Sequence, residues 1–86
     1  MPSERYARLR ERLEAKQQEF IAALKRLSNA PAPRSTTVEV LTDGIFNLLG
    51  VVTFWLSLDE PSETIMETIE RQLDEFRVGV FRRTVQ

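Results

Sequence analysis

The sequence predicts an all-α fold: a three-helix up-down-up bundle, or a helical hairpin with a long N-terminal helix. Apolar residues recur at helical spacing in three segments, and proline-containing turns separate these segments. The length of 86 residues predicts one domain, residues 1–86. A domain of this size buries only about 60–65% of its unfolded surface, so we expect it to gain stability by associating with a copy or a partner.

The first predicted helix covers about residues 4–28. Ser3 is a good N-cap residue, and the segment is rich in Ala, Leu, Glu, Arg and Gln, which all favour helix. Its apolar residues form a near-heptad seam of the kind found in coiled coils, with Lys16 at one seam position. The seam consists of Tyr6, Leu9, Leu13, Phe20, Leu24 and Leu27. A proline-rich linker, residues 29–35, ends this helix.

The second predicted helix is apolar and covers about residues 36–58. The run Thr36–Glu39 fits a capping box, and the polar residues fall within an arc of about 140° on a helical wheel. Apolar residues recur every three or four positions, at Val38, Leu41, Ile45, Leu48, Val52 and Trp55. Gly44 and Gly50 each weaken a helix by roughly 1 kcal/mol. We therefore expect tertiary cover, most simply from the other two helices.

An alternative for residues 37–58 is a β-hairpin, which would make the fold α+β. The run VTFWLSL alternates apolar and polar residues and is rich in β-branched and aromatic types. The preceding TDG is a possible hairpin turn after TVEVL. The helical interpretation is preferred because a strand would not gather the polar residues on one arc.

The third predicted helix covers about residues 61–77. Pro61 suits a first helical turn and Asp59 is a possible cap. Its apolar face consists of Ile65, Met66, Ile69, Leu73, Phe76 and Val80. Residues 78–86 form a basic tail whose conformation the sequence leaves open, because Gly79 lies among valines.

Charge is distributed unevenly, although the net charge is only −1. Residues 1–34 hold eight basic and four acidic side chains, whereas residues 35–76 hold one basic and nine acidic ones. A basic stripe on the first helix consists of Arg5, Arg8, Arg12 and Lys16, and an acidic stripe on the third consists of Glu63, Glu67, Glu70 and Asp74. The two stripes predict an intramolecular salt seam; a phosphate- or lipid-binding basic face is the alternative.

The second helix also carries a candidate partner-binding notch. Phe46 and Phe54 lie on its polar side, with Gly50 midway between them, which would let another helix approach closely. The alternative is that the tail, Val78 to Val85, covers both rings. A membrane span is less well supported: the uncharged run 44–58 is about 22 Å long, short of the ~30 Å needed, and no basic residue flanks it.

The residue types argue against most chemistry. The chain has no histidine and no cysteine, and its three glycines are isolated, so we predict no enzyme activity, no cofactor and no metal site. We expect a small adaptor or regulatory module that forms homo-oligomers, or docks on a larger protein, through the apolar second helix. A membrane-associated accessory subunit is the alternative, and a nucleic-acid-binding protein is less favoured. The N-terminus lacks the apolar run of a signal peptide, which predicts a cytoplasmic location.

Overall fold

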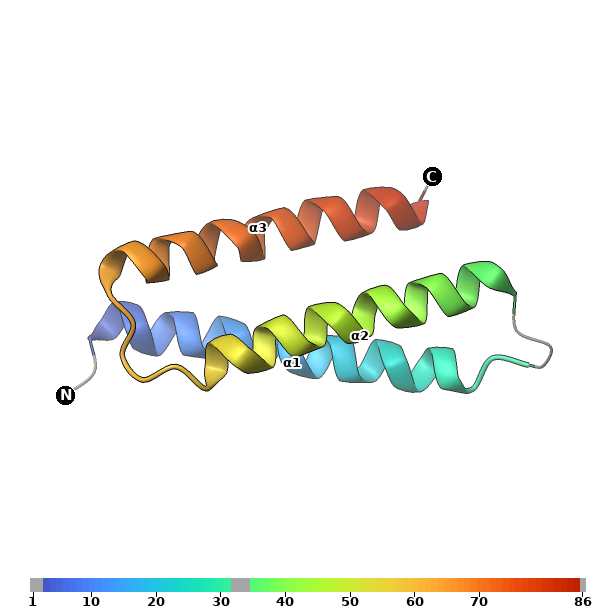
Figure 1. Ribbon diagram of the computed structural model, residues 1–86, viewed down its shortest axis with the longest axis horizontal. Helices are drawn as coiled ribbons and strands as arrows, with labels where there is room; N and C mark the ends of the chain where they lie inside the picture. Colours follow the sequence, from blue (N-terminus) through green and yellow to red (C-terminus); the bar gives the residue numbers. More distant parts are fainter. Residues whose placement is uncertain (1–2, 32–34, 86) are drawn as a thin grey trace. The chain divides into compact units, whose positions relative to one another are not determined.

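A computed structural model describes residues 3–31 and 35–85, with side chains as far as residue 76. Within these residues there are three helices and no strand: α1 (Glu4–Ser28), α2 (Thr36–Leu56) and α3 (Glu63–Val85), as Figure 1 shows. The predicted all-α fold is confirmed. The β-hairpin alternative for residues 37–58 is wrong, because α2 runs without interruption through the whole VTFWL segment.

Serine side chains begin the first two helices. The Ser3 hydroxyl accepts a hydrogen bond from the backbone N–H of Tyr6 at 3.1 Å, as its position before α1 predicts. The α2 cap is Ser35, one residue before the predicted capping box, and it accepts from the N–H of Val38 at 3.2 Å. At the other end, α2 stops at Leu56 with Ser57 as its C-cap, two residues earlier than predicted.

The third helix differs from its prediction at both ends. Ser62, rather than Asp59, caps it by accepting from the N–H of Ile65 at 3.3 Å, so Pro61 lies before the helix and not in its first turn. Glu60 turns the chain with a positive φ of 28°, a conformation that favours glycine. The helix continues beyond Arg77 to Val85, so the backbone of residues 78–85 is helical; Gln86 lies outside the described residues.

The chain divides into two compact units, and α1 belongs to both. The first unit joins Met1–Leu9 to Asp59–Gln86. Among its described residues the buried side chains are Leu9, Met66, Ile69 and Leu73, which follow the helical spacing that the sequence predicts. Ile65, which we also expected on the buried face, is 47% exposed because it lies at the edge of that face. The prediction of a single domain stays a prediction.

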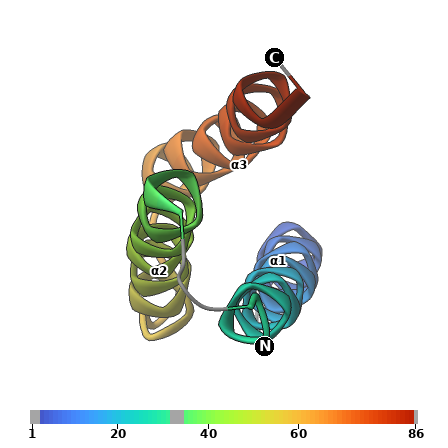
Figure 2. The same cartoon turned by 90° about the vertical axis from the view of Figure 1, so that its right-hand side faces the viewer.

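The second unit, Arg10–Leu58, is a helical hairpin. The longer part of α1 and all of α2 run in opposite directions, as Figures 1 and 2 show. Among its described residues the buried side chains are Leu13 and Phe20 on α1 and Val52 on α2. Across the hairpin, the Gln17 amide donates a hydrogen bond to the Thr53 hydroxyl at 3.3 Å. Residues 32–34 of the predicted linker lie outside the described part of the chain.

Candidate interaction surfaces

The most distinctive surface of the second unit is the outer side of α2. Val52 is the only buried residue of this helix. Phe46 is 64% exposed and Phe54 is 61% exposed. The cover that we expected from the other two helices stays a prediction, and the side chains of Val78 to Val85, the alternative cover, lie outside the described residues. We call the exposed set the α2 apolar face; it consists of Val40, Phe46, Gly50, Val51 and Phe54.

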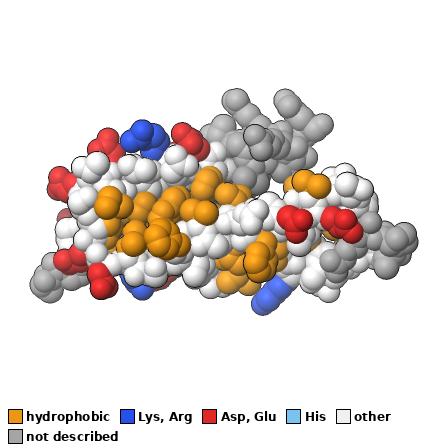
Figure 3. Space-filling view, viewed as in Figure 1, with side chains coloured by type: hydrophobic (Ala, Val, Ile, Leu, Met, Phe, Trp, Pro, Cys, Tyr) orange, Lys and Arg blue, Asp and Glu red, His pale blue; other side chains and the backbone are white. Residues whose placement is uncertain are grey.

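The apolar side chains of this face include two large aromatic rings and lie close together. The five positions span an arc of about 140° at 100° per residue. Four of them lie within three turns, between residues 46 and 54. Figure 3 shows hydrophobic side chains at several separate places on the surface of one face of the molecule. Asn47 lies within the same arc, and Glu39 and Asp43 lie on it nearer the start of α2, so the apolar side chains are concentrated between residues 46 and 54. Exposed apolar surface marks interaction sites more often than ordinary monomer surface does.

Among the described residues, nothing gives Gly50 a structural role. A Cβ atom placed on it would have no neighbour within 4 Å, and its backbone does not have positive φ. Glycine in a helix interior costs roughly 0.5–1 kcal/mol relative to alanine. Gly44 has equally open surroundings, but it lies about 120° round the helix from Gly50. Within the described part of the chain, neither packing nor backbone geometry explains the glycine between the two phenylalanines.

The length and composition of α2 also meet the minimum for crossing a membrane. The helix has 21 residues, or about 31 Å at 1.5 Å per residue, and only 6% of its most apolar window is buried in the structure. Its two charged residues, Glu39 and Asp43, are both acidic and both lie in its first half. By itself a single such helix is weak support for a membrane location.

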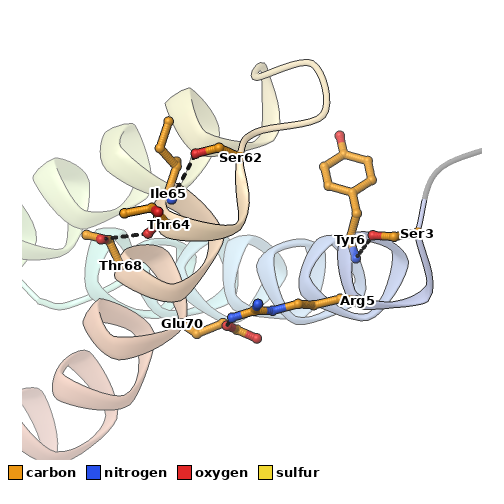
Figure 4. Close-up of polar contacts among 8 residues, drawn as sticks. All are labelled: Ser3, Arg5, Tyr6, Ser62, Thr64, Ile65, Thr68 and Glu70. Atoms are coloured by element: carbon orange, nitrogen blue, oxygen red, sulfur yellow. Dashed lines mark hydrogen bonds and ion pairs between the residues drawn. The ribbon is translucent and has the colours of Figure 1, made fainter.

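The basic stripe of α1 is partly neutralised by acidic neighbours. Arg5 makes a 2.7 Å ion pair with Glu70 of α3, shown in Figure 4. This hydrogen bond, together with the charges of Glu70, Glu63 and Glu67, raises the pKa of Arg5 above its ordinary value. The pair is one contact of the salt seam that the two charge stripes predict.

Lys16 also lies within the packed part of the helix. Its side chain is only 18% exposed, its ammonium group lies 2.9 Å from Glu19, and it stands 5.9 Å from the centre of the Phe20 ring. A lysine can bury its aliphatic stem in this way while its charge reaches a partner at the edge. Arg8 and Arg12, the other two members of the stripe, are exposed. The four cations therefore do not form one uniform basic surface.

The predicted site residues thus separate into two sets, the basic stripe on α1 and the three residues of the notch on α2. Phe46, Gly50 and Phe54 share one exposed face, as their spacing predicts. Sequence reasoning missed Val40 and Val51, although both follow helical spacing on the same side of α2.

The described residues contain no group of three or more acidic side chains placed to hold a metal ion. No protein-family model, curated protein or solved structure matches this chain.

Proposed function

We propose that this protein is a non-enzymatic interaction module that docks on another protein through the α2 apolar face. The exposure of Phe46 and Phe54 carries the proposal, because each ring leaves more than half of its area in water. A fully buried aromatic side chain removes about 150–250 Å² from water, so two such rings offer substantial binding energy. In this proposal the module is cytoplasmic and acts as an adaptor or assembly subunit.

A protein partner is favoured over a lipid bilayer by what lies beside α2. The antiparallel part of α1 carries eight charged side chains between residues 10 and 28. If α2 spanned a bilayer with this hairpin intact, those charges would enter hydrocarbon, at a cost of about 2.5–3.5 kcal/mol each near the centre. If the helices separated instead, the Gln17–Thr53 hydrogen bond would break and Phe20 would lose its cover. Docking a protein requires neither change.

A membrane-associated accessory subunit is the second candidate, because the length and composition of α2 are sufficient to cross a bilayer. In this case α2 would leave α1 and insert, while the basic residues of α1 would face anionic headgroups. A nucleic-acid partner is less favoured, because Arg5 and Lys16 are already engaged in ion pairs.

Site-specific photo-crosslinking in cells that produce the protein tests these candidates. A photoreactive residue replaces Phe46 or Phe54 in turn; the matched control carries it at Gln18, an exposed α1 residue on the side away from the buried seam. We expect protein adducts of defined mass from positions 46 and 54 and none from position 18. Lipid adducts would favour the membrane candidate. Absence of adducts at both α2 positions would overturn the proposal.

A further inference from the structure

We infer that the partner on the α2 apolar face is a second copy of this chain, with the two α2 helices antiparallel and crossing at Gly50. This inference rests on the proposed function and names its partner. In such a pair, each residue lies opposite the residue that is equally distant from Gly50 on the other side. Phe46 of one copy then lies beside Phe54 of the other, and the two Gly50 backbones meet at the crossing.

The residues on either side of Gly50 form a palindrome by residue type. The sequence FNLLGVVTF places phenylalanine four residues before and four residues after the glycine. Asn47 and Thr53, both polar, lie three residues away. Of the aliphatic residues between them, Val52 is fully buried in its own chain and takes no part in the pair. A twofold interface uses the same patch on both partners, so the residues that meet across it must suit each other, as two phenylalanine rings do. A docking site for an unrelated protein has no such requirement.

Gly50 supplies the close approach that this arrangement needs. No described residue lies within 4 Å of its Cβ position, so the missing side chain leaves room for another helix to approach there. Helices that cross at glycine bring their backbones together and allow the flanking side chains to interlock. In the antiparallel pair the flanking side chains are Phe46 and Phe54, which fill the space on either side of the crossing.

Charge selects the antiparallel orientation over the parallel one. Both charged residues of α2, Glu39 and Asp43, are acidic and lie before the crossing point. A parallel pair would place each beside its own copy, where like charges repel. In the antiparallel pair the two Asp43 residues are about 21 Å apart along the helices, and each lies opposite the uncharged Ser57 of the other copy. That separation exceeds the Debye length of about 8 Å at physiological salt.

The available area fits a weak, reversible dimer. From their exposed fractions, the two rings of one copy offer on the order of 200–300 Å², so two copies bury about twice that. The total area that the two copies bury reaches about 1,000 Å² when the marginal residues Asn47, Val51 and Thr53 are included. This is the lower limit for a specific interface. We therefore expect a dissociation constant in the micromolar range.

Cysteine cross-linking tests the orientation, and the chain has no native cysteine to interfere. Under mild oxidation, neither Phe46→Cys alone nor Phe54→Cys alone should form a disulfide-linked dimer, because the two copies of either cysteine lie about 12 Å apart in the antiparallel pair. An equimolar mixture of the two variants should form a disulfide-linked dimer, and it retains one of the two ring pairs. Self-linking of either variant alone at the rate of the mixture would overturn the inference.

Glycine variants test the crossing point. Gly50→Leu should raise the dimer dissociation constant at least about tenfold in sedimentation equilibrium. Gly44→Leu is the matched control: its surroundings are equally open, it lies on the same helix outside the proposed contact, and its dissociation constant should change less than about threefold. Circular dichroism verifies that both variants keep their helices. A dimer that tolerates Gly50→Leu would overturn the inference.

A wild-type protein that stays monomeric would also overturn the inference. The alkylation rate of the cysteine in Phe46→Cys then shows whether the proposed function still stands. Alkylation as fast as in denaturant means an open face, so docking on a different protein still stands. Slow alkylation means that the chain covers its own face, and both proposals fail. Protein that stays in solution only with detergent overturns both as well.

Discussion

Replacing Ile69 with alanine tests whether α3 buries the face that the structure assigns to it. Ile69 is only 2% exposed, and Ile69→Ala removes three carbon atoms from the first unit. At about 0.8 kcal/mol for each buried carbon, the transfer term is about 2.4 kcal/mol, and the cavity raises the expected loss to about 3 kcal/mol. A protein of this size has a free energy of unfolding of only about 4–13 kcal/mol, so the loss is large.

Ile65→Ala is the matched control, because it makes the same chemical change one turn earlier on the same helix. Ile65 is 47% exposed, so about half of the transfer term applies and the expected loss is about 1 kcal/mol. Urea unfolding followed by far-UV circular dichroism measures both variants, at protein concentrations low enough to keep the chain monomeric. Equal losses for the two variants would refute the assignment of the buried face.

Three further predictions concern the helix ends, the turn and the ion pair. Ser62→Ala should lower the free energy of unfolding by about 1 kcal/mol in the same urea assay, because α3 loses its N-cap; an unchanged midpoint would contradict that role. Glu60→Gly should raise stability by about 1 kcal/mol by relieving the positive φ, and a loss of stability would show that the turn has another conformation. A double-mutant cycle of Arg5→Ala and Glu70→Ala should give a small coupling that shrinks as salt rises; coupling that ignores salt would argue against an exposed pair. Because the pKa of Arg5 is raised, the stabilisation that its charge gives to the ion pair is fully present below the ordinary pKa of arginine and is lost only in strong alkali. A coupling energy that changes between neutral and mildly alkaline pH would contradict the raised pKa.

Helical periodicity was sufficient to identify the fold class, the order of the helices and most of the buried residues. Leu9, Leu13 and Phe20 are buried where the seam of α1 predicts. The helix ends were less predictable, since several serine, threonine and aspartate residues lie close together before α2 and α3. Ser35 and Ser62 act as caps because each lies three residues before the N–H that its hydroxyl reaches, and composition alone does not distinguish them from Thr36 or Asp59.

The exposure of α2 was harder to predict than its helicity. The sequence shows that this helix is apolar on most sides, and burial between two other helices is the usual result for such a segment. Which faces are covered depends on what packs against this helix, and this is a tertiary property. The spacing of Phe46, Gly50 and Phe54 nevertheless identified the centre of the exposed face.

The absolute mass of the purified protein in detergent-free buffer, measured by light scattering over a range of concentrations, tests the role of the α2 apolar face most directly. One chain has a mass of 10.0 kDa. We predict a mass approaching twice that value in the tens-of-micromolar range, returning to the monomer value on dilution and in Gly50→Leu. A mass of 10.0 kDa at every concentration would contradict self-association through this face.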